Sequence, residues 1–225
     1  MVEGVSNFIE SKINGSVVNT DPFPFLYVEN IFPEEYYNYI NSIFPKFDEL
    51  EDILSKPYKP VISDIQSRYT LSMYSRETKY KEIELKPFFQ ERVKLREFLY
   101  TDLVNLVANK LNINLPNFWD DDTRFVLDLS GYQKRPHTDH PKKVLSILIY
   151  MSESKCGTTL LKPKNSEFSD NYGSDHNYNE FIEVFDPPFK PNTLIAFPRT
   201  DTSFHCVKKL GQGESRKAIH INIRT

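Results

Sequence analysis

The chain has 225 residues, of which 39% are hydrophobic and 26% charged, and its formal net charge is −3. These values are typical of one globular domain with a single core. Basic and acidic residues are mixed along the chain, so we expect no surface for duplex nucleic acid. Two cysteines exclude a disulfide framework. We find neither a signal peptide nor an apolar run of membrane-spanning length, which predicts a cytoplasmic protein without membrane contact.

The first part of the chain, residues 1–115, predicts an α/β support region. Apolar residues at helical spacing indicate helices, and β-rich or alternating segments indicate strands. By these criteria we predict strands at residues 23–30 and 67–74 and helices at residues 33–43 and 87–111. The apolar stripe of the last of these helices is expected to pack into the core rather than to bind a partner.

The character of the chain changes at residue 116, where short β-rich segments separated by turn residues begin. We predict strands at residues 124–130, 133–137, 144–152, 158–162, 181–185, 193–197, 203–207 and 216–223. Eight short strands at this spacing are typical of a double-sheet jelly roll. The prediction is therefore a mainly β fold with flanking helices, in which residues 116–225 form the core of a single domain spanning residues 1–225.

A candidate metal site begins with His137 and Asp139. Residues i and i+2 of a strand point to the same face, so this imidazole and this carboxylate can converge on one ion. His205, 68 residues downstream in another predicted strand, is the candidate third ligand. Two histidines and one carboxylate leave three coordination positions open, as in non-haem Fe(II) oxygenases. An H-x-D tripeptide alone is weak support, because many occur by chance.

Arg216 strengthens this interpretation. It lies eleven residues after His205 and opens the last predicted strand. A strand beside the metal would place its guanidinium inside the barrel, where a charge without a partner is costly. We therefore expect the 5-carboxylate of 2-oxoglutarate to supply the missing counter-charge through a bidentate contact.

These motifs resemble a known family. The H-x-D pair, the distal histidine and the arginine about ten residues later occur in GYQKRPHTDHPKK…PFKPNTLIAFPRTDTSFHCV…RKAIHINI, within residues 131–225. In order, spacing and strand context this region is similar to the prolyl-4-hydroxylase-like branch of the 2-oxoglutarate/Fe(II) oxygenases. The segment FPFLYVENIFPEEYYNYI also resembles the opening of many members.

The resemblance implies a double-stranded β-helix, or cupin-like, core. It implies Fe(II), 2-oxoglutarate and O2 as cofactor and cosubstrates, and ascorbate as an added cofactor. The implied reaction couples oxidative decarboxylation of 2-oxoglutarate to succinate and CO2 with oxidation of a substrate. Asp139 favours hydroxylation, because related halogenases replace this carboxylate with a small residue.

The resemblance also implies further cofactor-binding residues. Tyr150 occupies a position at which several relatives present a tyrosine to the cosubstrate carboxylate, with a core tyrosine as the alternative. His220 lies four residues after Arg216 and should share its strand face. Leu160, or its neighbour Leu161, is expected to form an apolar wall of the cosubstrate pocket.

Four other polar features are expected to be structural or solvent-exposed. His140 is expected to face solvent or to support the site rather than to bind the metal, and His176 to be an exposed loop residue. Cys206 should be buried on the strand face opposite to His205. The acidic residues 120–122 are expected to form a solvated turn before a strand.

The segment from residue 163 to residue 180 is long and polar and joins two predicted strands. Loops of this kind are often functional. We expect it to border the mouth of the site and to select the substrate together with Arg68 and Arg76.

Two other functions remain open. The same three ligands would fit a zinc hydrolase or a structural zinc site, but there is no HExxH motif or obvious general base, and Arg216 would be unexplained. A non-catalytic sugar- or protein-binding jelly roll would have no reason to keep the three ligands and the arginine. The expected partner is a small-molecule or peptidyl substrate, and the sequence leaves its identity and the oligomeric state open.

Overall fold

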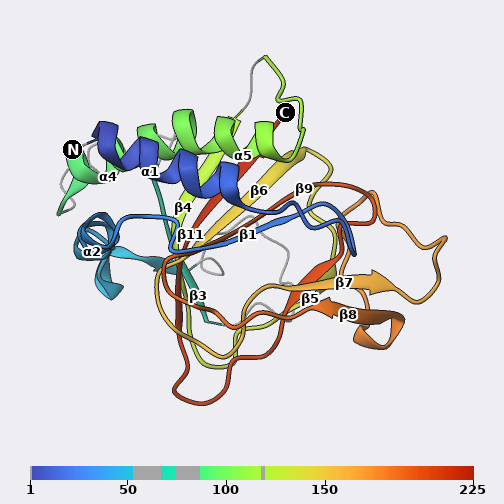
Figure 1. Cartoon of the computed structure of the whole chain (residues 1–225). Coiled ribbons are helices and arrows are strands. Elements are labelled where there is room, and N and C mark those ends of the chain that lie inside the picture. The colour runs from blue at the N-terminus through green and yellow to red at the C-terminus, as the bar shows by residue number, and fades with distance from the viewer. Residues whose placement is uncertain (1, 53–66, 74–86, 118–119) are drawn as a thin grey trace.

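A computed structural model describes residues 2–52, 67–73, 87–117 and 120–225, which form two antiparallel sheets and a layer of helices (Figure 1). The large sheet has the strand order β1-β9-β6-β11-β4-β3-β2 and the small sheet the order β5-β10-β7-β8. The mainly β, jelly-roll prediction is confirmed. Arg76 and the end of the strand predicted at 67–74 lie outside the described residues.

The strands agree closely with the segments expected from the sequence. The large sheet is made of β1 (Leu26–Glu29), β2 (Glu51–Asp52), β3 (Arg68–Ser72), β4 (Asp120–Asp128), β6 (Lys143–Tyr150), β9 (Thr193–Pro198) and β11 (Arg216–Arg224). The small sheet is made of β5 (Lys134–His137), β7 (Thr159–Pro163), β8 (Phe181–Phe185) and β10 (His205–Val207). The first part of the chain thus extends the same large sheet, since β3 pairs with β4 and β1 with β9.

The helices are α1 (Val2–Gly15), α2 (Glu34–Ser42), α4 (Phe89–Phe98) and α5 (Val104–Lys110), with a π-helical turn, η3 (Leu99–Leu103), between the last two. Figure 1 shows α1, α4 and α5 together along one side of the large sheet, away from β5, β7 and β8. Our sequence analysis missed α1, although its buried residues Val5, Ile9 and Ile13 recur every four positions. Within the described residues, no helix combines the length and apolar character needed to cross a bilayer.

The central strands of the large sheet have two chemically different faces. On β11, Ile219, Ile221 and Ile223 are fully buried in the core cluster that includes the helices. Burial of each such side chain contributes roughly 1.5–3 kcal/mol. The alternate residues of β11, including Arg216 and His220, face the opposite way because successive strand side chains alternate. The sheet therefore presents an apolar face to the helices and a polar face to the interior between the sheets.

The acidic run at the start of β4 corrects one expectation. Residues 120–122 belong to the strand rather than to a solvated turn. The carboxylate of Asp122 forms ion pairs with Arg124 and with Arg224, the latter at 2.8 Å. One arginine on the same strand and one on the neighbouring strand β11 thus neutralise a charge that the sequence alone suggested would be solvated.

Candidate active site

His137 and His205 are brought together by strand register. They are directly opposite each other in the antiparallel pair β5–β10, and their ring centroids lie 4.3 Å apart. Asp139 follows two residues after His137, and the candidate ligand atoms of all three residues lie within 4.8 Å of one another. Within the described residues this is the one such group of three or more histidine, cysteine or acidic side chains.

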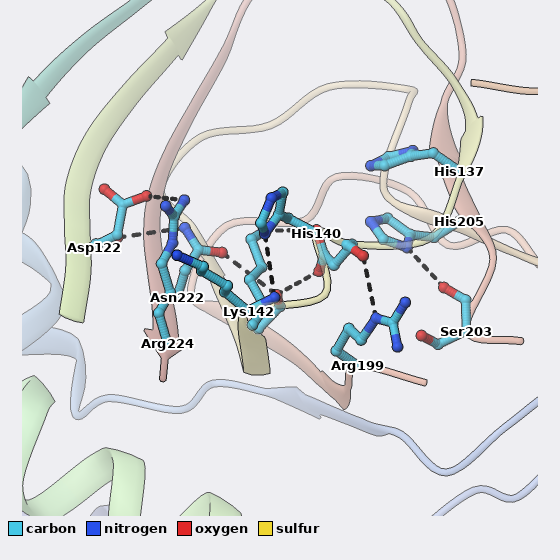
Figure 2. Close-up of polar contacts among 12 residues, drawn as sticks. Asp122, His137, His140, Lys142, Arg199, Ser203, His205, Asn222 and Arg224 are labelled. Atoms are coloured by element: carbon cyan, nitrogen blue, oxygen red, sulfur yellow. Dashed lines mark hydrogen bonds and ion pairs between the residues drawn. The ribbon is translucent and has the colours of Figure 1, made fainter. Parts of the chain in front are cut away.

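Backbone carbonyls orient both imidazoles. Nδ1 of His137 lies 2.9 Å from the carbonyl oxygen of Arg135. Nδ1 of His205 lies 3.0 Å from the carbonyl oxygen of Ser203 (Figure 2). Because a carbonyl only accepts, each Nδ1 carries the proton and each Nε2 keeps its lone pair. This tautomer is the one that metal-ligating histidines commonly use, with the other ring nitrogen held by a neighbouring group.

Both imidazoles are neutral near pH 7. Burial, followed by the neighbouring His205 ring, lowers the pKa of His137 well below its usual value. Burial likewise lowers the pKa of His205, although Asp139 opposes this shift. Neutral imidazole is the form that binds a metal ion.

Asp139 is ionised and held by two neighbours. Burial favours the neutral carboxyl, but the opposing effect, chiefly that of the Lys143 ammonium group, is larger, so the pKa of Asp139 is well below its usual value. Oδ1 lies 2.5 Å from Nζ of Lys143, and Oδ2 accepts a hydrogen bond of 2.6 Å from the Ser146 hydroxyl. Each carboxylate oxygen has a second lone pair that remains for a metal ion.

His140 does not take part in this group. It is exposed, and its Nδ1 accepts a hydrogen bond from the backbone N–H of Lys142 in the turn between β5 and β6 (Figure 2). The carbonyl oxygen of His140 closes the same turn by accepting from the N–H of Lys143. His140 thus faces solvent, as one of the two sequence expectations stated.

The three residues stand in the wall of a cavity of about 590 Å³ that is partly open to solvent. The cavity is lined by Arg68, Tyr132, Lys134, His137, Asp139, Lys143, Ser146, Leu148, Thr158, Phe197, His205, Val207, Arg216, His220 and Asn222. Both sheets contribute to this lining.

Arg216 lies in the cavity wall as predicted, but the expectation that it lacks a counter-charge is wrong. Its Nη2 lies 2.9 Å from Oδ2 of Asp128, and both groups are almost fully buried. Asp128 also binds Arg68, whose Nε and Nη2 lie 2.6 and 2.9 Å from its two oxygens. The strand register explains the cluster, because Asp128 is directly opposite Arg68 on β3 and Arg216 on β11.

Two buried polar atoms in the same wall have no partner among the described residues. They are Oγ1 of Thr158, on a residue only 1% exposed, and Nε2 of His220. An unsatisfied buried group costs about 1–3 kcal/mol. Burial, then Arg68 and Arg216, lower the pKa of His220 well below its usual value, so its ring is neutral. A ligand with acceptor oxygens would fit here, with Thr158 donating to it.

Tyr150 and Leu160 lie behind the cavity rather than in its lining. The Tyr150 hydroxyl accepts a 2.9 Å hydrogen bond from the N–H of Thr158, and its ring stacks on Phe189 with centroids 4.0 Å apart. Leu160 is fully buried in the same apolar cluster. Tyr150 therefore supports the loop that carries Thr158, while Leu160, paired with His205 in the register of β7 and β10, backs the metal end.

The segment from residue 163 to residue 180 is organised around Asp170. The carboxylate of Asp170 accepts hydrogen bonds of 2.7 Å from the N–H groups of Tyr172 and Ser174, and lies 2.9 Å from Nε2 of His176. His176 also packs its ring against Phe168 and is largely buried, so the expectation of an exposed loop histidine is wrong.

This segment packs against β5 and the residues that follow it, which include the candidate metal ligands His137 and Asp139. The hydroxyl of Thr138 donates a 2.9 Å hydrogen bond to the Asp170 carbonyl. At Gly173, with φ +75°, an added Cβ would lie 3.3 Å from the backbone of Asp139, so only glycine fits without displacement. Asp175 forms an ion pair with Lys134 in the cavity wall. The segment thus borders the cavity, and its part in substrate selection stays a prediction.

No protein-family model matches the chain, and no curated protein matches it by sequence. Solved structures do match. A prolyl-4-hydroxylase from Pseudomonas putida is similar with a TM-score of 0.56 and 14% identity, over 100% of this chain and 98% of that chain. A 2OG-Fe(II) oxygenase family oxidoreductase from Burkholderia pseudomallei is similar with a TM-score of 0.52 and 12% identity, over 99% and 91%. HygX from Streptomyces hygroscopicus, solved with nickel, 2-oxoglutarate and hygromycin B, has a TM-score of 0.53 and 10% identity, over 89% and 82%.

The fold is that of the 2-oxoglutarate/Fe(II) oxygenases. This confirms the fold implied by the sequence resemblance. At identities of 10–14% the likeness establishes the fold and not the activity. The function therefore depends on what the side chains of this chain can do.

Several residues of the cavity wall were not predicted from the sequence. Asp128 had a signal, because the predicted strand RFVLDLS places it on the face opposite to Phe125 and Leu127. Nothing in the sequence around Lys143, four residues after Asp139, distinguishes it from an exposed lysine. Thr158 was counted only as part of a strand, and its orphan hydroxyl is visible only in three dimensions.

Proposed function

We propose that the protein is an Fe(II)- and 2-oxoglutarate-dependent dioxygenase that hydroxylates its substrate. One observation carries the proposal. A single cavity has two imidazoles and a carboxylate with free lone pairs at one end and two arginines at the other. A chelating 2-oxo acid with a distal carboxylate is complementary to both ends, whereas a hydrolytic zinc site would have no use for the arginines.

At the metal end, His137, Asp139 and His205 would hold Fe(II). Iron bound there would supply the oxidising chemistry for which 2-oxoglutarate and O2 are the cosubstrates and succinate and CO2 the products. The carbonyls behind the two imidazoles fix their direction before metal binds, and Ser146 fixes the carboxylate. This preorganisation reduces the conformational entropy that the ligand side chains lose when the metal binds.

At the other end, Arg216 and Thr158 would bind the 5-carboxylate of 2-oxoglutarate. Arg216 supplies a charged donor, and the Thr158 hydroxyl supplies a neutral one that otherwise has no partner among the described residues. A hydrogen bond between a charged donor and a carboxylate is about twice as strong as a neutral one. We therefore assign most of the affinity for this carboxylate to the arginine side and its orientation to Thr158.

The substrate is proposed to be a peptidyl residue or a small metabolite that enters at the side bordered by the 163–180 segment. Asp175 and Lys134 hold that segment against the cavity wall. Replacing residues 165–178 with a short Gly-Ser turn should abolish substrate turnover. Full turnover in that variant would contradict a role for the segment in substrate selection.

The direct test is succinate release from 2-oxoglutarate under air with Fe(II) and ascorbate. We expect slow release without any added substrate, dependent on Fe(II) and blocked by a chelator. Tight binding of zinc with no release of succinate and no binding of 2-oxoglutarate would contradict the proposal and favour a zinc site. A protein that bound neither metal nor 2-oxoglutarate would favour a non-catalytic jelly roll.

A further inference from the structure

The cations of the cavity wall are nearly all matched by acids. Lys143 is paired with Asp139, and Lys134 is paired with Asp175. At the arginine end, Arg68 and Arg216 share a single carboxylate, Asp128. This end therefore carries one surplus positive charge, and the surplus exists only because Arg68 is present.

This surplus positive charge determines whether binding of a ligand carboxylate is electrostatically favourable. Arg216 and Asp128 are each 1% exposed, and together they form a neutral buried pair. A carboxylate placed beside that neutral pair would leave an uncompensated negative charge in a desolvated site, which is costly. With Arg68 added, the same carboxylate brings the group to neutrality.

The number of guanidinium N–H donors that remain without an acceptor among the described residues also indicates Arg68. A guanidinium has five N–H donors. Arg216 directs two toward Asp128 and two toward the carbonyls of Cys156 and Gly157, which leaves one. Arg68 directs two toward Asp128, which leaves three without a partner among the described residues. Arg216 alone cannot present a two-donor fork without giving up a bond it already has.

Arg68 is also held in place for this task. Its guanidinium lies over the ring of Tyr132, 4.2 Å from the centroid, and it lines the same cavity as Arg216. Its side chain is 16% exposed, so it is open to the cavity rather than sealed in the core. Stacking on one side and Asp128 on another restrict the side chain before a ligand arrives.

We propose that Arg68 is a second carboxylate-binding residue of the 2-oxoglutarate site. With both arginines present, the group that shares Asp128 has the net positive charge that Arg216 and Asp128 alone would lack. The inference rests on the proposed function, since it concerns the same cosubstrate. It also assigns to Arg68 the cosubstrate rather than the substrate selection expected from the sequence. Asp128 is the positioning residue that holds both guanidinium groups at one end of the cavity.

The test is calorimetric binding of two ligands to the Mn(II)-loaded protein, which avoids turnover. The ligands are 2-oxoglutarate and pyruvate, a 2-oxo acid that lacks the distal carboxylate. Arg68→Ala should weaken 2-oxoglutarate binding roughly 10- to 100-fold and leave pyruvate binding within about twofold of wild type. Arg68→Lys, which keeps the charge but loses the planar fork, should lie between the two.

The matched control is Arg124→Ala. Arg124 is also a partly buried arginine paired with an aspartate on the large sheet, and it lies outside the cavity lining. Its loss should leave the affinity for 2-oxoglutarate unchanged. Thermal unfolding of each variant shows whether it is folded, and Arg68→Ala should fold, because Asp128 keeps Arg216 as a partner.

A charge-restoring double variant separates charge from packing. In Arg68→Ala/Asp128→Asn the surplus positive charge returns through Arg216, so 2-oxoglutarate binding should recover at least about threefold over Arg68→Ala. Unchanged affinity in Arg68→Ala, an equal loss for pyruvate, or no recovery in the double variant would each overturn the inference. If the wild-type protein bound no 2-oxoglutarate at all, the proposed function would fail instead.

Discussion

The two ends of the cavity are built in different ways. At the metal end each side chain is fixed by neighbours that leave at least one lone pair free for an ion: carbonyls hold the imidazoles, and Ser146 and Lys143 hold Asp139. At the arginine end the chain supplies more positive charge than it neutralises, and a hydroxyl has no partner among the described residues. One end is complementary to a cation and the other to an anion.

This difference indicates how one cavity between two sheets can serve two chemistries. At the metal end the register of β5 and β10 brings the two histidines together, and hydrogen bonds between neighbours in sequence, such as His205 with Ser203, orient their rings. The arginine end depends on register across β3, β4 and β11, which only the folded sheet provides. Variants at the two ends should therefore fail in different ways.

The largest effect is expected from Asp139→Ala at the metal end. The change removes a ligand and leaves Lys143 without its partner, so a cation would stand where Fe(II) should bind. We expect no succinate release above background and loss of Fe(II) binding, measured by coupled assay and by metal analysis after desalting. His140→Ala is the control, because His140 is exposed in the next turn. An Asp139→Ala variant with full activity would remove the triad from consideration.

Arg216→Ala should produce a large but different loss at the arginine end. Truncating one buried charged partner costs on the order of 2–5 kcal/mol. The KM for 2-oxoglutarate should rise about 30-fold or more, while the Fe(II) requirement stays near that of wild type. Steady-state kinetics at several concentrations of each component separate the two. An unchanged KM for 2-oxoglutarate, or an equal rise in the Fe(II) requirement, would show that the two ends are not distinct.

The same contrast explains what the sequence could predict. Alternation in segments such as RKAIHINI predicted β11 and the shared face of Arg216 and His220, because strand periodicity is local. The ligand spacing predicted His137, Asp139 and His205, which the fold brings within 4.8 Å. These features depend on residues close in sequence or on a motif with fixed spacing.

The pairing of Arg68 with Asp128 could not be predicted in this way. The two residues are 60 positions apart, and they meet because β3 adds to the edge of β4 in a particular register. A shift of one residue in the pairing of β3 with β4 would place the side chains of Arg68 and Asp128 on opposite faces of the sheet. The sequence therefore showed Arg216 as an unpaired charge, and only the register showed its carboxylate partner.

A moderate loss of stability is expected from Asp170→Ala in the segment that packs on the metal end. The variant loses the hydrogen bonds to Tyr172, Ser174 and His176 that organise the segment. We expect a loss of about 1–3 kcal/mol in the free energy of unfolding, measured by urea denaturation. Glu167→Ala, an exposed acid in the same segment, should change stability by less than about 0.5 kcal/mol.

The pH dependence sharpens this prediction. Burial opposes ionisation of Asp170, but its hydrogen bonds with His176 and two backbone N–H groups outweigh burial and lower its pKa. A lowered pKa stabilises the fold above the unfolded value, about 3.9, and this contribution is lost as the pH falls through the folded pKa. Wild type should therefore lose more stability than Asp170→Ala as the pH is lowered from 5 to 3. Parallel pH profiles would contradict this.

The smallest effect is expected from Thr158→Val at the arginine end, and its sign differs between the free and bound protein. Valine keeps the shape of threonine but removes Oγ1, which is buried without a partner among the described residues. Without ligand, the variant should be as stable as wild type or slightly more stable, because an unsatisfied group is gone. With ligand, 2-oxoglutarate should bind more weakly by about 0.5–1.5 kcal/mol. Thermal unfolding with and without 2-oxoglutarate measures both. A variant destabilised in the free state would mean that Thr158 serves the fold rather than the ligand, and the arginine end would then resemble the metal end in having no polar group reserved for an anion.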